Sequence, residues 1–249
     1  MGFVAALKCE SCRIPPEALQ RALNVNLPKE IAVTGCCAVE EDFHPRYDAA
    51  AKRYRYRWYQ SGTRDPFREG MAVQLPRPVD AAAMNEAAGL LLGTHNFSAF
   101  CAAGGKIPPE ERVRTLTECA VIPIGDEIHL TVTGDGFLYN MVRIIAGTLV
   151  KIGMGVYPPE KMEEILEEKN GAAAGPTIPA RGLTLVSLEY EKELAPYLEG
   201  ENKHWHYVLD QRNVPEKGLA YLTIERCEPE ELDGVLRRVI HQAYRNGAK

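Results

Sequence analysis

Residues 51–60, AKRYRYRWYQ, alternate basic and aromatic side chains. One side of this period of two carries guanidinium groups and the other carries rings: Arg53, Arg55 and Arg57 against Tyr54, Tyr56 and Trp58. The period predicts a β-strand, because successive side chains of a strand point to opposite faces of the sheet. One interpretation is a half-solvated strand with its rings in a core. The alternative is an RNA site, since guanidinium groups bind phosphates and rings stack on unpaired bases.

The segments around this strand predict a mixture of helices and hairpins. Helical spacing is found in residues 11–24, 80–93, 136–156 and 158–171, and strand-like runs in residues 30–43, 71–75 and 182–190, with a hairpin over residues 115–134. Hairpin-like neighbours dominate this order. It therefore predicts an α+β fold with a mixed, mostly antiparallel sheet flanked by helices.

Several of these elements have an apolar side that we expect to face a core. The predicted inward residues are Leu19, Ala22 and Leu23 of the first helix, Met84, Ala87, Ala88 and Leu91 of the second, Val142, Ile145, Leu149 and Ile152 of the third, and Ile128, Leu130 and Val132 of the hairpin. Asp80 is the expected N-cap of the second helix and Gly93 its end.

Composition restricts the classes of function. A net charge of -5 argues against a protein that coats nucleic acid non-specifically, although a local basic patch remains compatible with it. Seven cysteines, an odd number, indicate free thiols and a cytoplasmic protein. Cys9 and Cys12 have no second pair at zinc spacing, so a pair of small half-buried residues is favoured over a metal site. Arg143 and Lys151 interrupt the most apolar stretch, which predicts a core helix and no membrane anchor.

Arg143 lies between apolar residues of a predicted helix, with no acid within one turn on either side. A guanidinium group on an apolar helix needs a partner from elsewhere in the molecule, because burying it alone costs several kcal/mol. That partner is a carboxylate, a phosphate, or water if the side chain reaches the surface.

Four blocks of the chain together carry a family resemblance. They are FHPRYDAAAKRYRYRWY, LLLGTHNFSAF, GDGFLYNMVRIIAGTLVKIG and AAAGPTIPARGLTLVSLEY. In this order and spacing, over about Cys9 to Tyr190, the chain resembles the TruA-type tRNA pseudouridine synthases. The resemblance implies isomerisation of uridine to pseudouridine in tRNA, with the anticodon stem-loop as the target. It also implies a homodimer and neither a metal nor an organic cofactor.

The resemblance also implies roles for particular residues. Tyr54 matches the tyrosine that stacks on the target base, and Arg143 matches the arginine that pairs with the catalytic aspartate. An aromatic platform suits this chemistry because the flipped base must be held while it is detached. The basic residues of this region are the expected contacts to RNA: Arg46, Lys52, Arg53, Arg55 and Arg57.

The chain departs from the family at the catalytic aspartate. In the family this residue belongs to a motif resembling R-T-D-x-G-V-H-A, upstream of a strand that corresponds to FVAALK here. The motif is not found in the 249 residues, so we expect an N-terminally truncated and catalytically incomplete chain. Asp42 and Asp48 read as solvated loop residues, and a Gly-Asp-Gly turn explains Asp135.

The predicted domains are a remnant of an N-terminal subdomain at residues 1–41, a main catalytic and RNA-binding domain at 42–191, and a linker with an additional segment at 192–249, which ends in a predicted helix at 230–249. Three hypotheses follow. The first is a tRNA pseudouridine synthase, the second a non-catalytic RNA-binding or dimerisation module, and the third a protein with a further function in its last segment.

Overall fold

The computed structural model describes residues 3–8, 15–28, 31–39, 43–190 and 204–211. The chain forms two compact units, Met1–Ala50 with Ser187–Lys249 and Ala51–Val186. The division predicted from the sequence at residues 41 and 191 stays a prediction. In the part of the chain that is described, no helix is long and apolar enough to cross a membrane.

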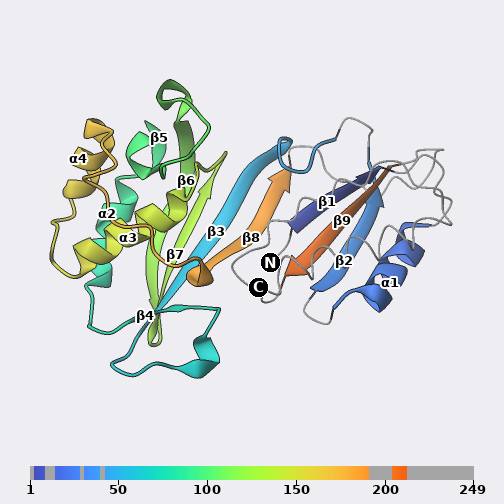
Figure 1. Ribbon diagram of the computed structural model, residues 1–249, viewed down its shortest axis with the longest axis horizontal. Helices are drawn as coiled ribbons and strands as arrows, with labels where there is room; N and C mark the ends of the chain where they lie inside the picture. The colour runs from blue at the N-terminus through green and yellow to red at the C-terminus, as the bar shows by residue number, and fades with distance from the viewer. Residues whose placement is uncertain (1–2, 9–14, 29–30, 40–42, 191–203, 212–249) are drawn as a thin grey trace. The chain divides into compact units, whose positions relative to one another are not determined.

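The larger unit is built on a mixed sheet (Figure 1). Its strands are β3 (Ala49–Gln60), β4 (Val73–Leu75), β5 (Gly93–Asn96), β6 (Val113–Ile124) and β7 (Glu127–Gly134), in the order β4-β3-β7-β6-β5, with β8 (Leu183–Tyr190) also paired to β3. Along this order β3 and β4 are parallel, and the pairs β3–β7, β6–β7 and β5–β6 are antiparallel. The predicted α+β fold with a mostly antiparallel sheet is therefore confirmed.

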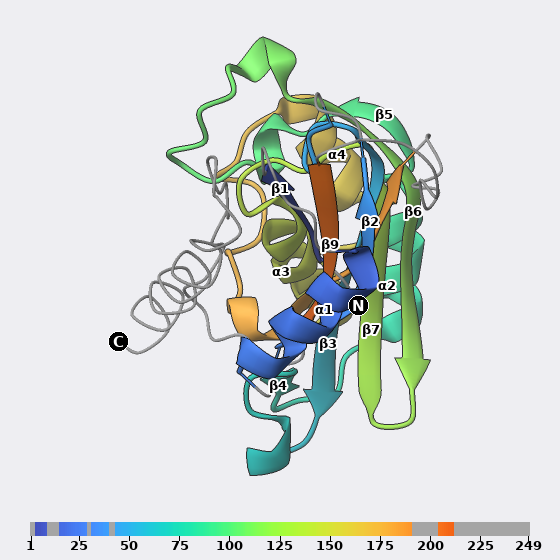
Figure 2. The ribbon, with the colours of Figure 1, turned by 90° about the vertical axis from the view of Figure 1, so that its right-hand side faces the viewer.

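The predicted hairpin forms β6 and β7, which run side by side to their turn (Figure 2). Gly125 in this turn has φ +63°, a conformation that glycine adopts without a steric penalty. The inward residues of β7 are fully buried as predicted: Ile128, Leu130 and Val132.

One face of the sheet is covered by helices α2 (Ala81–Gly89), α3 (Met141–Gly153) and α4 (Lys161–Glu168) (Figure 1). Asp80 caps α2, since its carboxylate accepts hydrogen bonds from the backbone N–H groups of Ala82 and Ala83. The predicted inward residues of α2 and α3 are buried. The predicted end of α2 was wrong: the helix stops at Gly89, and Gly93 begins β5, which was not predicted from the sequence.

The smaller unit contains β1 (Phe3–Lys8), α1 (Pro16–Asn26), β2 (Ile31–Ala38) and β9 (His204–Gln211), with strand order β1-β9-β2, all antiparallel. Leu19 and Leu23 of α1 are buried as predicted, but Ala22 is exposed. The side chain of Asn24 binds both the N–H and the C=O of Val33, next to a bulge in β2.

Strand β9 lies where the sequence reads as a linker, so that part of the interpretation was wrong. The segment HWHYVLDQ contains residues that favour strands, and β1 and β2 supply hydrogen bonds on both of its sides. The predicted helix at 230–249 lies outside the described residues.

Candidate functional site

Arg143 is half-buried in the first turn of α3, and two neutral oxygens orient its guanidinium group. Its Nε donates to the backbone carbonyl of Ile178 at 2.7 Å, and its Nη1 donates to Oδ1 of Asn140 at 3.1 Å. None of the ion pairs formed by the described residues includes Arg143. The group is thus fixed in direction while its positive charge has no carboxylate beside it in this part of the chain.

Asn140 precedes α3 in the left-handed conformation, with φ +59°. An asparagine at this position usually caps the helix by accepting from a backbone N–H of the first turn. Here no such cap bond forms, and the amide oxygen accepts from Arg143 instead. The Asn140 side chain therefore orients Arg143 and leaves the first turn of α3 without a side-chain cap.

The carbonyl that holds Arg143 belongs to the strap, which we define as residues 175–179, GPTIP. The strap lies so close to α3 that a Cβ on Gly147 would overlap the Pro176 carbonyl, and a Cβ on Gly175 would overlap the Thr148 backbone. Gly175 N–H donates to Oγ1 of Thr148 at 2.8 Å. These contacts fix the strap along the helix.

The far end of the strap is held from the sheet. Tyr56, whose side chain is fully buried in β3, donates its hydroxyl to the carbonyl of Pro179. The preceding carbonyl, that of Ile178, receives Arg143. Sheet, strap and helix thus meet at the arginine that the sequence identified.

Tyr54 is half-buried on β3, two residues from the fully buried Tyr56 and on the same face of the sheet. Its ring meets Phe137 edge to face, with centroids 5.0 Å apart and an interplanar angle of 85°. A ring that stacks on a base must present a face, and the half-buried Tyr54 ring is compatible with this role. Tyr54 does not line the cavity described below.

The arginine row of β3 lies on the opposite face of the sheet, away from α2 and α3. Arg53 pairs with Glu118 at 2.9 Å and donates to Thr133 at 3.1 Å. Arg55 is exposed, and Arg57 is half-buried. The structure therefore does not bring this row together with Tyr54 and Arg143.

The two other predicted RNA contacts lie elsewhere. Lys52 is two residues before Tyr54 in β3, so the two side chains lie on the same face of the sheet. Arg46 is exposed in the smaller unit, with its guanidinium carbon 5.8 Å from the ring centroid of Tyr47.

The acids considered as replacements have other roles where they are described. Asp135 is exposed and accepts from the Thr115 N–H at 3.1 Å, as expected of a turn residue. Asp48 accepts from the His44 N–H at 2.8 Å in the smaller unit. Burial, with the Asp48 carboxylate as a second cause, raises the pKa of Tyr190, whose hydroxyl donates to the Pro45 carbonyl. Asp42 lies outside the described residues.

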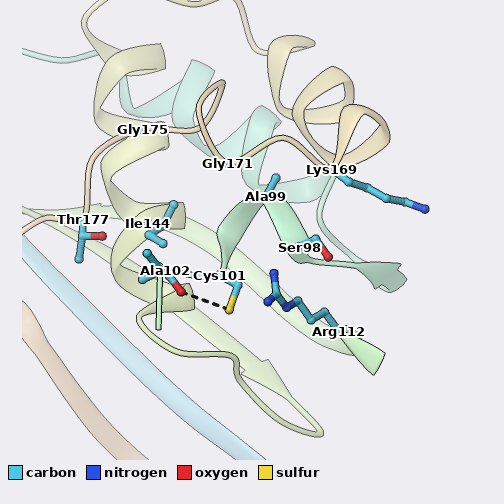
Figure 3. Close-up of a pocket in the computed structure, with 11 residues that line it drawn as sticks. Ser98, Ala99, Cys101, Ala102, Arg112, Ile144, Lys169, Gly171, Gly175 and Thr177 are labelled. Atoms are coloured by element: carbon cyan, nitrogen blue, oxygen red, sulfur yellow. Dashed lines mark hydrogen bonds between the residues drawn. The ribbon is translucent and has the colours of Figure 1, made fainter. Parts of the chain in front are cut away.

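A cavity of about 490 Å³ lies beside the strap, within the larger unit (Figure 3). It is lined by residues of the turn after β5, by Arg112 and Ile144, and by Gly175 and Thr177 of the strap. This cavity, Asn140 and the strap were not predicted from the sequence. The sequence signal for them was that Asn140, GPTIP and Ser98 of the cavity stand inside three of the four family-like blocks.

Known proteins resemble this chain over most of its length. A family profile described as "tRNA pseudouridine synthase" matches residues 87–191, which include Arg143, the strap and the cavity but not Tyr54. The fold is that of an RNA-modifying class, and the chain belongs to the tRNA pseudouridine synthase family.

Individual relatives are tRNA pseudouridine synthase A proteins. That of Shouchella clausii (strain KSM-K16) is 47% identical over 182 residues, 73% of this chain and 69% of the relative. That of Staphylococcus aureus (strain MRSA252) is 42% identical over 175 residues, 70% of this chain and 66% of the relative. That of Halalkalibacterium halodurans is 44% identical over 173 residues, 70% of this chain and 65% of the relative. The matched region thus spans about two thirds of these relatives.

Proposed function

We propose that this chain binds tRNA and takes part in converting uridine to pseudouridine, with the anticodon stem-loop as its target. One observation carries the proposal: Arg143 is held by Asn140 and Ile178 with its charge uncompensated by any described carboxylate. Such a group is prepared to receive a carboxylate, because a charge-assisted hydrogen bond is about twice as strong as a neutral one.

In this proposal Tyr54 stacks on the target base, and Arg143 orients the catalytic carboxylate. The half-buried ring of Tyr54 supports its role, since its edge-to-face contact with Phe137 holds it in place. No metal or organic cofactor is needed for a carboxylate-assisted isomerisation. The remaining contacts to RNA are electrostatic, from Lys52 on the Tyr54 face and from Arg46, Arg53, Arg55 and Arg57 elsewhere.

We further propose that the chain works in the cytoplasm as a homodimer, as the family resemblance implies. The exposed apolar side chains Ile122 and Ile124 of β6 support a role in association.

A second candidate function is RNA binding without catalysis. It is favoured because none of the described carboxylates pairs with Arg143, and a tyrosine and basic groups bind and orient a base but supply no nucleophile. We therefore expect the 249 residues to bind tRNA and not to isomerise it.

The test combines a tRNA-binding titration with tritium release from tRNA labelled at carbon 5 of uridine. The 249-residue chain should bind and release no tritium above background. A version extended at its N-terminus with a segment carrying R-T-D-x-G-V-H-A should release tritium, and Tyr54→Ala in that version should abolish most of the release. Turnover by the 249 residues alone would contradict the expectation and direct attention to acids such as Asp48.

A further inference from the structure

The cavity beside the strap has no role in the chemistry proposed so far. Its walls come from the segment around Ser98 and Cys101, from Arg112, from Ile144 of α3 and from Thr177 of the strap (Figure 3). Its volume of about 490 Å³ falls in the range of small-molecule sites, roughly 300–1,000 Å³. It is therefore large enough for one nucleotide.

The charged residues of the lining are all basic. No aspartate or glutamate is among the described lining residues, although the whole chain carries a net charge of -5. Arg112 points its guanidinium group toward Ser98 and Cys101, whereas the side chain of Lys169 runs away from them (Figure 3). Arg112 is consequently the cation that this lining offers to an anion.

Arg112 is also held in place. Its Nε donates to the carbonyl of Ile107 at 2.8 Å, and none of the ion pairs within the described ranges includes it. A guanidinium group that is oriented by a carbonyl and lacks a carboxylate is suited to bind a phosphate with its two Nη groups.

The cavity adjoins the Arg143 site through two residues. Ile144 in its wall follows Arg143 in α3, and Thr177 precedes Ile178, whose carbonyl receives Arg143. Consecutive residues of α3 and of the strap thus contribute to the two places, and a polynucleotide is a ligand long enough to reach both. Among the described residues no aromatic side chain lines the cavity, so its walls offer no stacking platform for a base.

We propose that this cavity binds the phosphate and ribose of the nucleotide next to the target uridine of tRNA. Arg112 binds the phosphate, and the hydroxyls of Ser98 and Thr177 face the ribose. The inference rests on the proposed tRNA binding and deepens it, because it adds a second subsite that fixes the position of the target in the strand.

Cys101 provides a reporter for the test, because its half-buried thiol lines the cavity. The 249-residue chain is treated with iodoacetamide with and without a saturating unmodified tRNA transcript, and alkylation is read at each cysteine by peptide mass spectrometry. With the transcript at about ten times its Kd, mass action leaves roughly a tenth of the sites free, so we expect alkylation of Cys101 to slow by about tenfold. Buried Cys119 should stay unmodified in both samples and report that the chain is folded.

Arg112→Gln should abolish this protection, weaken tRNA binding roughly three- to tenfold and lower the salt slope of log Kd by about one. Arg112→Lys should retain only part of the protection, because it keeps the charge but loses the paired Nη donors of the guanidinium group. Lys169→Asn is the matched control on the rim, and its Asn tolerates the positive φ of +52° at that position. Protection of Cys101 should survive it.

The outcomes separate the two proposals. If the transcript binds but Cys101 alkylates at its free rate, the cavity assignment is wrong while tRNA binding stands. If inorganic phosphate or uridine monophosphate at the transcript's concentration protects Cys101 equally, the cavity is a site for free phosphate and the assignment to bound tRNA is overturned. If the transcript does not bind, both proposals fail, and the titration shows this directly.

Discussion

Asn140 and Arg143 are joined by a hydrogen bond of 3.1 Å that replaces the usual N-cap of α3. Asn140→Gly and Asn140→Ala both remove this bond, which contributes about 1 kcal/mol. Only the alanine must also adopt φ +59°, at a cost of roughly 1–2 kcal/mol. We therefore expect urea denaturation to give the alanine variant a free energy of unfolding roughly 1–2 kcal/mol lower than that of the glycine variant.

Lys169 supplies the control for this comparison, because it has φ +52° at the end of α4 and is exposed. Lys169→Gly should raise the free energy of unfolding by a few tenths to about 1 kcal/mol, since glycine favours this position. Equal stabilities of the two Asn140 variants would show that backbone conformation at Asn140 is not under constraint.

The strap packs against α3 through glycines at which an added Cβ would overlap backbone atoms. Gly147→Ala should lower the free energy of unfolding by about 2–3 kcal/mol, because the new Cβ would overlap the Pro176 carbonyl. Gly89→Ala is the matched control in α2, where a Cβ meets nothing within 4 Å, and it should be neutral or stabilising by up to about 1 kcal/mol. Thermal or urea unfolding measures both, and similar losses in both variants would contradict the close packing of strap and helix.

Tyr54 should contribute to tRNA affinity through its ring. Tyr54→Phe should bind tRNA nearly as well as the unchanged chain, whereas Tyr54→Ala should lose about 1–3 kcal/mol of binding free energy, the usual value of one stacked base. Tyr47→Ala is the control, because Tyr47 is exposed and belongs to the smaller unit, whereas Tyr54 belongs to the larger one. Loss of affinity in the Tyr47 variant alone would show that Tyr54 is not the stacking residue.

The arginine row of β3 should act through charge. Arg55→Gln combined with Arg57→Gln should lower the salt slope of log Kd for tRNA by about two, one for each phosphate that is no longer neutralised. Arg53→Gln should have a smaller effect, because Arg53 is already paired with Glu118. A slope unchanged by the double variant would place RNA away from this face of the sheet.

Cys119 should make stability depend on alkaline pH. Burial is the main cause that raises the pKa of its thiol from 9.0 to about 12, with Glu118 as a second cause. The folded state therefore holds this proton more tightly than the unfolded state, and the resulting stability is complete below pH 9 and lost as the pH rises toward 12. The difference in unfolding free energy between the unchanged chain and Cys119→Ala should shrink over that range, and a constant difference would contradict the burial of the thiol.

Most helices and strands of the larger unit were predicted from the sequence, because each carries its own periodic signal. The rings and guanidinium groups of β3 separate to two faces as the alternation indicates, and Asp80 caps α2 through its own side chain. Ala22 in the middle of α1 is exposed and Gly93 begins β5, because a small residue fits several local patterns and packing decides among them. Strand β9 carries residues that favour a strand, but it pairs with β1 and β2, which lie far from it in the chain, so no local pattern predicts its place in the sheet.

The order of residues alone establishes that Arg143 stands on an apolar helix and that Tyr54 shares a strand with arginines, because both are statements about neighbours in the chain. The surroundings of these two residues depend on long-range packing instead. Ile178 is 35 residues from Arg143, and Pro179 is 123 residues from Tyr56, so no local pattern encodes either hydrogen bond. Close packing at Gly147 brings these distant backbone carbonyls together and leaves the cavity at Arg112 beside them.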